Sequence, residues 1–497
     1  MLDHNACYRA LKARDHRFDG KFFTGVTSTG VYCRPVCPAI APKAKNCTFF
    51  VCAAAAEEAG FRPCMRCRPE TAPGTPAWRG TSATVSRGMQ LIEEGALDDG
   101  TVEDLAERLG VGDRHLRRLF VEHLGAPPLS IAQTRRAHFA KRLIVDTRLP
   151  MTRIAFAAGY RNVRRFNAEV QRVFHRSPRE MRTLGQKKKS RSEEPTITLR
   201  QSFRAPLDWD ALLAFLGPRA IPGVESVQNG VYRRTVGEDD FTGVIEVSRA
   251  STQRNHHLLI SVPVAATPHL GRLAARVRAL FDLSADPAVI ADQLATDAQL
   301  KRLVRAHPGL RVPGAWNRFE TAVRAILGQH VTVAGATRLA GKLVRSFGRQ
   351  IEGAVGGEDP IADGSGAASA LTHIFPRPAD LADADIASIG MPKARAETIR
   401  SMAKAVCDGR PILETAPNLE TALGRLIALP GCGDWTAQYI AMRALREPDA
   451  FPAGDLGLRK ALAKNETLPT ASAVRKRAES WRPWRAYAAL WLWTSLG

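Results

Sequence analysis

The apolar positions of residues 101–175 recur every three or four residues, which is the period of amphipathic α-helices. Two short helices are predicted there, at 101–110 and 151–160, and each ends at a glycine. A second, more basic helix follows each of them, at 113–125 and 162–175. A short helix followed across a turn by a basic helix, found twice, predicts a pair of helix-turn-helix units.

The period changes after about residue 197. Segments such as 196–203, 243–250 and 257–264 are strand-like, and the last two end in turn-prone or proline positions. After about residue 270 the spacing is helical again to the end of the chain. A strand-rich region between two helical regions indicates several domains.

Three stretches lack any period and are rich in Pro, Gly or charge. They predict breaks at 71–82 and 185–196, and a long surface loop inside a later domain at 353–370. Together with the changes of period they predict four domains and a linker. The predicted bounds are 1–78, 82–184, the linker 185–196, 197–300 and 301–497.

Length and charge narrow the function. A chain of 497 residues has room for three or four independent cores. The 71 Lys and Arg residues against 49 Asp and Glu residues give a formal net charge of +22, which favours nucleic acid over a membrane surface as partner. A basic protein without such a partner is the alternative. No run approaches 18 apolar residues and the N-terminus lacks a signal-peptide core, so we expect a cytoplasmic protein.

The positive charge is concentrated in residues 135–191, which contain 17 Lys or Arg and three acidic residues. DNA-binding helices explain this imbalance better than a solvated helix face does. A helical protein-interaction module with basic faces is the alternative. The candidate DNA contacts lie on the second helix of each predicted unit: Arg114, His115, Arg117, Arg118, Asn162, Arg164, Arg165 and Asn167.

Four of the nine cysteines form two close pairs separated by 26 residues. Cys33 and Cys37 are spaced C-x3-C, and Cys64 and Cys67 are spaced C-x2-C. In a reducing compartment such pairs favour metal binding over disulfides, and four sulfurs suit tetrahedral Zn(II). The spacing predicts one zinc site and leaves open whether it is a structural knuckle or contains a reactive thiolate.

Residues 426–445 predict two helices joined by the tight turn LPGCG. Gly431 and Gly433 let backbone N–H groups approach a phosphate at the second helix, as in a helix-hairpin-helix that grips DNA without reading sequence. Twenty residues after Trp435, Asp455 stands directly before another predicted helix. A simple helix cap is the alternative to a chemical role for this aspartate.

The segments STGVYCRPVC and GFRPCMRC resemble the N-terminal methyl-acceptor domain of the Ada family of adaptive-response regulators, over roughly residues 3–70. The resemblance implies that Cys33 is both a zinc ligand and the nucleophile that takes a methyl group from a methylphosphotriester in DNA. Cys37, Cys64 and Cys67 would be the other ligands. Zinc keeps a bound thiol deprotonated, and methylating one of four thiolates changes the formal charge of the cluster from −2 to −1, which favours DNA binding.

The same resemblance implies that Thr29 and Arg62 contact DNA. Family members often place arginines after the second cysteine, whereas this chain has Pro38, Ala39 and Ile40 there. This difference predicts a weaker grip on phosphate.

Residues 84–184 resemble the AraC-type DNA-binding domain, most clearly in GYRNVRRFNAEVQRVFHRSPREMR. The resemblance implies a transcription regulator that binds promoter DNA and acts together with RNA polymerase.

Residues 197–497 resemble the 3-methyladenine DNA glycosylase II family of the helix-hairpin-helix superfamily. Four ordered motifs carry the resemblance: LRVPGAWNRFETAVRAILGQHVTV, LPGCGDWTAQYIAMRAL, FPAGDLGLRK and WRPWRAYAALWLW. It implies that Asp455 is the catalytic carboxylate, which stabilises a sugar cation and orients or deprotonates the attacking water. It also implies that Trp435, Tyr439 and Trp493 line a pocket for a flipped, electron-poor base.

Three departures from relatives refine the expected activities. Bifunctional relatives carry a lysine where this chain has Trp435, so we expect a monofunctional glycosylase that leaves an abasic site intact. The residue after ILGQ, usually Leu or Gln in the family, is His330 here and is the expected wedge in the DNA. The P-C-H-R motif of alkylguanine methyltransferases is missing, so O6-alkylguanine repair is not expected.

The expected fold is multidomain α+β: a small zinc α/β domain, an all-α double helix-turn-helix domain, an antiparallel β-sheet domain with helices, and a mostly α helix-hairpin-helix glycosylase domain. The expected function is an adaptive response to DNA alkylation that joins methyl acceptance, transcription regulation and base excision. The expected cofactor is one Zn(II), with no organic cofactor, and the expected partners are alkylated and promoter double-stranded DNA and RNA polymerase. The alternative is a transcription regulator with a structural zinc site and a catalytically inactive glycosylase-like half.

Overall fold

The computed structural model describes residues 2–73, 82–185, 196–238, 240–250, 256–351, 370–463 and 467–496. Most of each predicted break, at 71–82, 185–196 and 353–370, lies outside these residues. The chain separates into two compact units, described one at a time. The first comprises Met1–Ala205, Ala250–Arg278 and Leu283–Asp286, and the second comprises Pro206–Arg249, Ala279–Asp282 and Pro287–Gly497.

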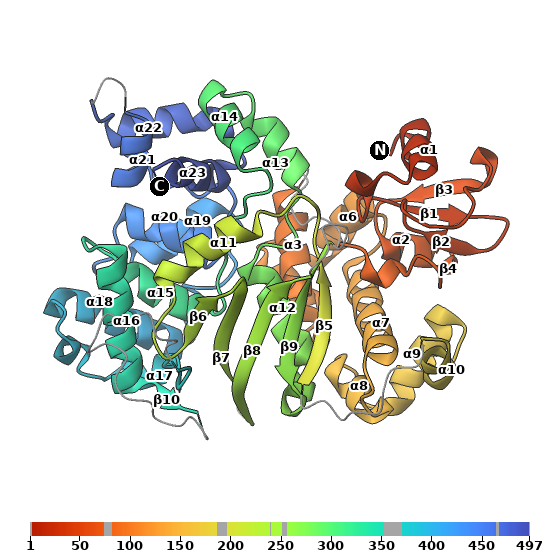
Figure 1. The fold of residues 1–497 in the computed structure, drawn as a ribbon, viewed down its shortest axis with the longest axis horizontal. Helices are drawn as coiled ribbons and strands as arrows, with labels where there is room; N and C mark the ends of the chain where they lie inside the picture. Colours follow the sequence, from red (N-terminus) through yellow and green to blue (C-terminus); the bar gives the residue numbers. More distant parts are fainter. Residues whose placement is uncertain are drawn as a thin grey trace. The chain divides into compact units, whose positions relative to one another are not determined.

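The first unit begins with a four-stranded sheet in the order β3-β1-β2-β4 (Figure 1). Its strands are β1 (Phe23–Val26), β2 (Val31–Cys33), β3 (Cys47–Phe50) and β4 (Arg62–Pro63), with helices α1 (His4–Ala13) and α2 (Ala53–Glu58). β1 is antiparallel to both β2 and β3, whereas β4 is parallel to β2 and pairs Arg62 with Val31. The parallel pairing brings the residues that follow β2 close to those that follow β4.

Eight helices follow the sheet in the described part of the first unit. They are α3 (Ala83–Glu93), α4 (Ala96–Asp99), α5 (Val102–Arg108), α6 (Asp113–Leu124), α7 (Pro128–Asp146), α8 (Met151–Ala157), α9 (Val163–Phe174) and α10 (Pro178–Gly185). The four predicted helices are confirmed as α5, α6, α8 and α9. Thr101 and Asp104 form a capping box that starts α5, and Asn162 caps α9.

The first unit ends with strand-rich segments. β5 (Thr196–Ser202) pairs antiparallel with β9 (His257–Pro263), and a 3-10 helix, Val264–His269, leads into α12 (Leu270–Leu280). Side chains of β5 alternate between exposed and buried, as the period of two predicts for a strand with one face in a core.

The second unit contains an antiparallel run of three strands and most of the C-terminal helices. The strands are β6 (Glu225–Gln228), β7 (Val231–Glu238) and β8 (Phe241–Arg249). The short strands β10 (Arg349–Gln350) and β11 (His373–Ile374) pair antiparallel. The helices are α11 (Trp209–Leu216), α13 (Pro287–Leu294), α14 (Ala298–Ala306), α15 (Arg318–Leu327), α16 (Val333–Phe347), α17 (Pro378–Leu381), α18 (Lys393–Cys407), α19 (Leu419–Ile427), α20 (Asp434–Arg443), α21 (Leu456–Ala461), α22 (Ala471–Ala478) and α23 (Arg485–Thr494).

Three elements of the second unit differ from the sequence-based picture. Helix α11 interrupts the predicted strand region because Asp208 caps it and its apolar face, including Leu212 and Leu216, is buried. β10 and β11 lie within the predicted helical region and consist of two residues each, too short for a period to show.

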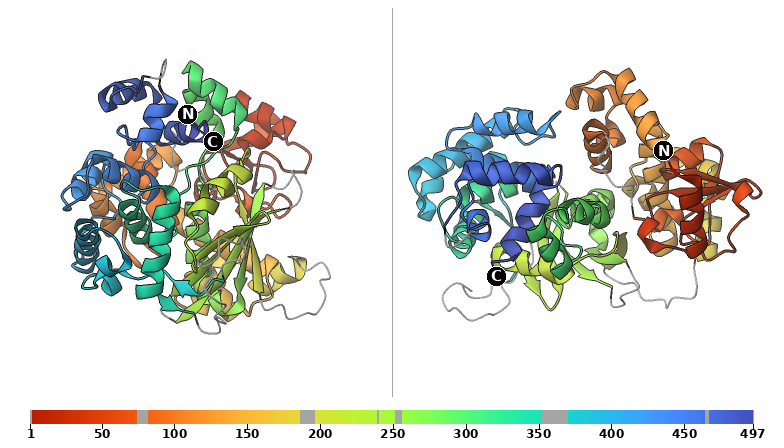
Figure 2. Two further views of the ribbon diagram at one scale, coloured as in Figure 1. Left: turned by 60° about the vertical axis from the view of Figure 1, so that its left-hand side comes forward. Right: turned by 90° about the horizontal axis from the view of Figure 1, so that it is seen from above.

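Helices α15 to α20 share one apolar core, which contains Ile326, Leu343, Ile399, Leu426 and Ile440. In Figures 1 and 2 the helices α15 to α20, coloured from blue-green to blue, gather around this core. In the part of the chain that the structure describes, no helix is both long and apolar enough to cross a membrane.

The fold is multidomain α+β, with the sheet-containing cysteine domain, the helical domain and the later sheet and helices that the sequence predicts. The border between the two compact units passes through the predicted domain 197–300. The domain bounds therefore stay predictions.

Candidate functional site

The four paired cysteines converge in the first unit. Cys33 ends β2, Cys64 follows β4 and donates its N–H to Tyr32 O at 3.0 Å, and the β2–β4 pairing holds the two cysteine pairs together. All four are buried, with exposed fractions of 6–8%. Their ligand atoms all lie within 4.8 Å of one another: Cys33, Cys37, Cys64 and Cys67. Four buried sulfurs at this spacing are consistent with one tetrahedral Zn(II) site.

Arg34, between the first two cysteines, braces this cluster. Its backbone N–H donates to Cys67 Sγ at 3.4 Å, and its side chain donates to Thr71 Oγ1 at 2.8 Å and forms an ion pair with Asp19. Backbone N–H groups that point at sulfur stabilise thiolates, so Arg34 supports the negative charge of the cluster. Sequence reasoning missed this role, although an arginine between two ligands was a visible signal.

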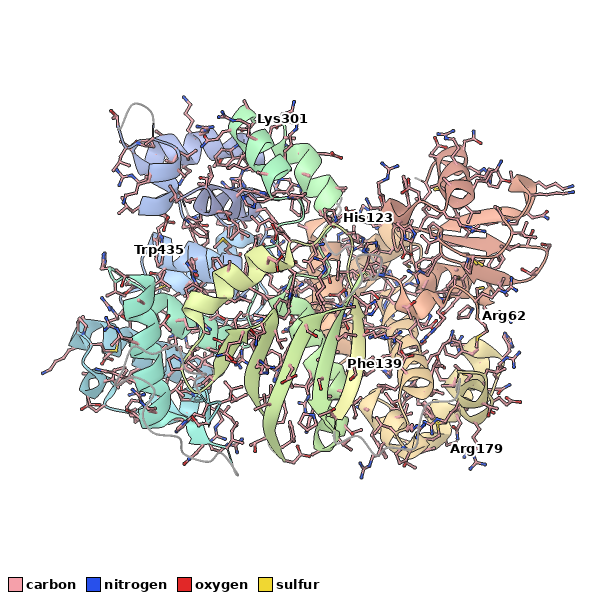
Figure 3. All side chains as sticks on the ribbon, in the orientation of Figure 1. Arg62, His123, Phe139, Arg179, Lys301 and Trp435 are labelled. Carbon is pink, nitrogen blue, oxygen red and sulfur yellow. The ribbon has the colours of Figure 1, made fainter. Side chains whose placement is uncertain are left out.

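Thr29 and Arg62 lie at one end of the cysteine-domain sheet. Thr29 is exposed in the turn that joins β1 to β2. The backbone N–H of Arg62 donates to the carbonyl of Gly30, the residue that follows Thr29, at 3.0 Å. Figure 3 labels Arg62 at this end. The two predicted DNA contacts are therefore close together: Thr29 lies in the turn before β2, which leads to Cys33, and Arg62 lies on β4, which leads to Cys64.

The loop Pro38–Ile40 projects beside the cluster, with Ile40 94% exposed. The guanidinium of Arg14 donates to the carbonyls of Pro38 and Ala39 at 3.2 and 3.4 Å. A cation from the end of α1 thus lies against the loop that lacks the arginines of relatives. No local pattern indicates this contact, because 24 residues separate Arg14 from Pro38.

Helix α7 is tied to the cysteine domain by buried polar groups within the first unit. Glu57 accepts hydrogen bonds from Tyr32 at 2.8 Å and Thr134 at 2.7 Å and contacts His138 at 3.1 Å. Burial raises the pKa of Glu57, but its bonds to His138, Thr134 and Tyr32 outweigh burial and leave that pKa below its usual value.

The predicted DNA-contacting arginines of the basic helices α6 and α9 differ in whether they form ion pairs within the protein. Arg164 and Arg165 are exposed at the start of α9. Arg117 on α6 is instead paired with Glu103 at 2.7 Å and with Asp113 at 3.5 Å. Arg114 and Arg118 are exposed on α6, and Arg118 contacts His115 at 3.0 Å.

Asp455, in the second unit, caps α21 with a carboxylate that accepts three hydrogen bonds. Leu458 N–H donates to Oδ1 at 3.0 Å. The indole N–H of Trp493 donates to the same oxygen at 2.8 Å, and that of Trp435 donates to Oδ2 at 2.9 Å. Asp455 therefore does cap a helix, as the alternative proposed, through its bond from Leu458. The bonds from the two indoles are additional to that cap, and a catalytic role for Asp455 stays a prediction.

The three predicted pocket residues lie together around Asp455. Trp435, labelled in Figure 3, stacks on Tyr439 with ring centroids 5.3 Å apart and planes 14° apart. The rings of Tyr439 and Trp493 are 6.3 Å apart at 49°. All three rings are partly exposed, so an aromatic ligand can reach them.

Behind Tyr439 lies a cluster of arginines. Arg443 donates from Nη1 to Tyr439 Oη at 2.9 Å. Burial raises the pKa of Tyr439, but the positive charges of Arg443, Arg219 and Arg324 and the bond from Arg443 outweigh burial and bring that pKa below its ordinary value.

The hairpin between α19 and α20 has the geometry that its glycines predict. Gly431 has φ +79°, and a Cβ there would lie 2.0 Å from Thr398 Oγ1, so only glycine fits. Gly433 begins α20 in open space. Gln329 donates to Gly431 O at 3.1 Å and to Thr436 Oγ1 at 2.9 Å, which links the hairpin to the end of α15.

His330, next to Gln329, is exposed and has φ +56°. A non-glycine residue in the left-handed region is strained, and such strain concentrates at functional positions. The predicted wedge residue therefore protrudes beside the hairpin.

Comparison with known families agrees with this arrangement. The metal binding domain of Ada matches residues 6–70, and a helix-turn-helix domain matches residues 105–183. The AlkA N-terminal domain matches residues 198–317, and the HhH-GPD superfamily of base excision DNA repair proteins matches residues 323–485.

Individual relatives are similar either to the whole chain or to one part of it. The chain is 40% identical over 496 residues to the probable bifunctional transcriptional activator/DNA repair enzyme AlkA of Mycobacterium tuberculosis, covering 99% of this chain and 97% of that protein. It is 32% identical over 299 residues to DNA-3-methyladenine glycosylase 2 of Escherichia coli, which covers 60% of this chain and 96% of the relative. It is 35% identical over 130 residues to the bifunctional transcriptional activator/DNA repair enzyme Ada of Escherichia coli, covering 26% of this chain and 35% of that protein.

The Ada-type buried sulfur cluster, the paired helix-turn-helix units and the helix-hairpin-helix beside Asp455 all lie within the 99% of this chain that aligns with the full-length relative. The chain belongs to the family of bifunctional transcriptional activator/DNA repair AlkA proteins.

Proposed function

We propose that this chain detects DNA methylation through its cysteine cluster, activates transcription through its helix-turn-helix units, and excises alkylated bases of the 3-methyladenine type. The observation that carries the enzymatic part is the carboxylate of Asp455, which Trp435 and Trp493 hold beside partly exposed aromatic rings. The names of the Mycobacterium tuberculosis and Escherichia coli relatives support the same combination.

Methyl acceptance is proposed for Cys33. Its sulfur forms a bond to the methyl carbon while the bond from that carbon to the phosphotriester oxygen breaks, and the electron pair stays on the oxygen. The products are a cysteine thioether and an ordinary phosphodiester, so each molecule reacts once. Zn(II), held by the four cysteines, would keep the accepting sulfur deprotonated.

Thr29 and Arg62 are proposed to hold the damaged backbone near Cys33, because they lie close together at the start of the two strands that lead to the cluster. Arg164 and Arg165, with the exposed arginines of α6, are proposed to contact promoter DNA. The activated complex is proposed to engage RNA polymerase.

Base excision is proposed to begin when a base flips between the aromatic side chains. Alkylation at N3 or N7 of a purine makes the base cationic and a good leaving group, so the N-glycosidic bond breaks with its electron pair going to the base. The sugar cation that remains is stabilised by Asp455, because three donors fix the carboxylate and a fixed charge needs no reorganisation during the reaction. Water then adds to the sugar carbon, and its proton passes to the carboxylate of Asp455 or to solvent water, which leaves the abasic site.

Positioning of DNA is assigned to the hairpin and to His330. Gly431 and Gly433 keep the backbone N–H groups at the start of α20 accessible to a phosphate. His330 would fill the gap that the flipped base leaves. Because Trp435 stands where bifunctional relatives carry lysine, the proposed product is an intact abasic site.

The test is release of 3-methyladenine from a methylated duplex by the full chain. Asp455→Asn should reduce release by at least about 100-fold, the order that one preorganised charge contributes to an active site. Asp292→Asn, an exposed carboxylate on α13, is the matched control and should leave release unchanged. Wild-type protein that binds DNA but releases no base would favour the alternative, a regulator with an inactive glycosylase-like half.

A further inference from the structure

The phenol oxygen of Tyr439 faces guanidinium groups. Arg443, which is 7% exposed, donates to it from Nη1 at 2.9 Å. The other nitrogens of Arg443 donate to the backbone carbonyls of Pro313 and Gly314. These bonds fix the guanidinium, and in the described residues it pairs with no carboxylate.

Arg219 is a second cation, and its guanidinium lies close to the same ring as that of Arg443. The guanidinium carbon of Arg219 lies 3.9 Å from the ring centroid of Phe215, and that of Arg443 lies 4.9 Å from the same centroid. Among the described residues Arg219 also has no carboxylate partner, and its side chain donates to Phe215 O at 2.9 Å. Two positive charges, of which Arg443 is buried and Arg219 is half-buried, therefore meet at Tyr439 without a compensating acid.

A third arginine is neutralised. Arg324 on α15 contacts Glu225 on β6 at 2.8 Å and Glu320 on its own helix at 3.4 Å. The charged groups around Tyr439 are thus Arg443 from α20, Arg219 from the 3-10 helix Gly217–Arg219, and Arg324 with its two glutamates. Asp455 lies beyond Trp435, which separates it from Tyr439 by a stacked ring.

The neighbouring arginines determine where the hydroxyl proton of Tyr439 can point. An arginine only donates hydrogen bonds, so the phenol oxygen must accept from Arg443 and its own proton must point elsewhere. The described residues offer that proton no acceptor. Uncompensated buried cations are costly, and loss of the proton to water would place a negative charge between them. Burial raises the pKa of Tyr439, but Arg443, then Arg219 and Arg324, lower it further than burial raises it.

Three other tyrosines, all buried, have the opposite surroundings. Each donates its hydroxyl to a carboxylate, and burial together with that carboxylate holds its pKa well above the ordinary value. The pairs are Tyr32 with Glu57 at 2.8 Å, Tyr232 with Glu225 at 2.6 Å and Tyr487 with Asp282 at 2.6 Å. Tyr439 differs from these three tyrosines in the charge of its neighbours, and its side chain is also less buried than theirs.

We propose that Tyr439 discriminates between bases by their charge. Its side chain is a tyrosinate between Arg443 and Arg219, and the negative charge of the tyrosinate favours a cationic alkylated purine over a neutral base. This inference rests on the proposed function, in which Trp435, Tyr439 and Trp493 form the base pocket. A tyrosinate forms as the pH rises through the pKa of the phenol. Preference for the cationic base therefore increases with pH across that titration and is lost below it.

Ionisation is tested on the free full-length protein by the near-ultraviolet absorbance of tyrosinate. The difference between wild type and Tyr439→Phe should show one tyrosinate forming below the ordinary tyrosine pKa of about 10. Arg443→Gln keeps a hydrogen-bond donor without the charge and should move this titration to higher pH. Tyr160→Phe is the control, because the Tyr160 hydroxyl has no hydrogen-bond partner in the structure and its pKa is raised. A titration at or above the ordinary pKa overturns the proposal.

Selectivity is tested with two duplexes, one carrying cationic 3-methyladenine and one carrying neutral hypoxanthine. The ratio of kcat/KM for the first over the second should rise by about tenfold across the titration, the order of one desolvated charge interaction with a base. Tyr439→Phe should make the ratio independent of pH while both bases are still released. A wild-type ratio that does not change overturns the proposal. If neither base is released, the proposed function fails, and the absorbance experiment, which needs no substrate, separates that failure from the ionisation of Tyr439.

Discussion

The indole Nε1 of Trp493 donates a hydrogen bond to Oδ1 of Asp455 at 2.8 Å, across 38 residues of sequence. Trp435 makes the equivalent bond to Oδ2, and its ring stacks on Tyr439. Each tryptophan therefore has a polar edge directed at the proposed catalytic carboxylate and an apolar face that can contribute to a base pocket.

Removing one indole N–H should lower the rate of base excision. Trp493→Phe keeps an aromatic ring but loses the bond to Asp455, and we expect kcat to fall by about 10- to 100-fold, because hydrogen bonds to a charged group are worth about 1.5–3 kcal/mol. KM should change less. Single-turnover release of 3-methyladenine measures the effect.

A double-mutant cycle distinguishes the two functions of Trp493. If the tryptophan acts through Asp455, Trp493→Phe should have little further effect in the Asp455→Asn background. Equal losses in both backgrounds would mean that stacking alone accounts for Trp493.

Cys33 should be the sulfur that gains a methyl group. After incubation with DNA containing methylphosphotriesters, peptide mass spectrometry should find one added methyl on Cys33 and none in Cys33→Ser. Cys407 is an exposed thiol and reports on non-specific methylation. Methylation of Cys407 at the same level as Cys33 would contradict a specific acceptor.

Removal of zinc should unfold the cysteine domain before the glycosylase half. Four buried sulfurs within 4.8 Å of one another need a metal to balance their charge, and structural zinc contributes folding free energy directly. A strong chelator should abolish methylation of Cys33 while release of 3-methyladenine continues. Simultaneous loss of both activities would show that the halves fold as one unit.

Arginines of the two basic helices should contribute unequally to DNA binding. Arg164 is exposed, whereas Arg117 is already paired with Glu103 and Asp113. Arg164→Ala should weaken promoter binding and reduce the slope of log affinity against log salt by about one, the value for one phosphate contact. Arg117→Ala should change the slope less. The reverse order would assign the main contact to α6.

The buried network around Glu225 should make the second unit sensitive to acid. Burial raises the pKa of Glu225, but Arg324, Arg234 and the hydroxyl of Tyr232 outweigh burial and lower it. Its stabilisation is therefore complete above the unfolded pKa of about 4.3 and is lost as the pH falls through the lower, folded value.

Breaking this network at neutral pH tests the same point. Arg234→Met leaves buried carboxylates underpaired and should cost about 3–5 kcal/mol in the free energy of unfolding. Glu246→Gln, which removes a half-exposed pair with Arg233, should cost less than about 1 kcal/mol. Chemical denaturation of both variants decides whether burial of the pair sets the cost.

Local patterns predicted much of this molecule. Helical period located α5, α6, α8 and α9, and cysteine spacing identified the four sulfurs that converge. Residue type also identified the hairpin glycines, because only glycine fits at Gly431. These features depend on residues close in sequence or on a chemical type that few alternatives explain.

Features that depend on distant contacts were not predictable. Arg443 donates to the carbonyl of Pro313, which is 130 residues away in the sequence, and Arg14 donates to the carbonyl of Pro38, which is 24 residues away. Helix α11 lies within a region predicted as strands because almost all of its residues are apolar, so no helical period shows in its sequence. The surroundings of Tyr439 therefore had to come from the structure.

The most direct test of the account uses one preparation of full-length protein and one methylated duplex. Mass spectrometry of Cys33 and release of 3-methyladenine are measured together, for wild type, Cys33→Ser and Asp455→Asn. The account predicts that Cys33→Ser loses only methyl acceptance and Asp455→Asn loses only base release. Wild-type protein that neither gains a methyl on Cys33 nor releases the base would contradict it.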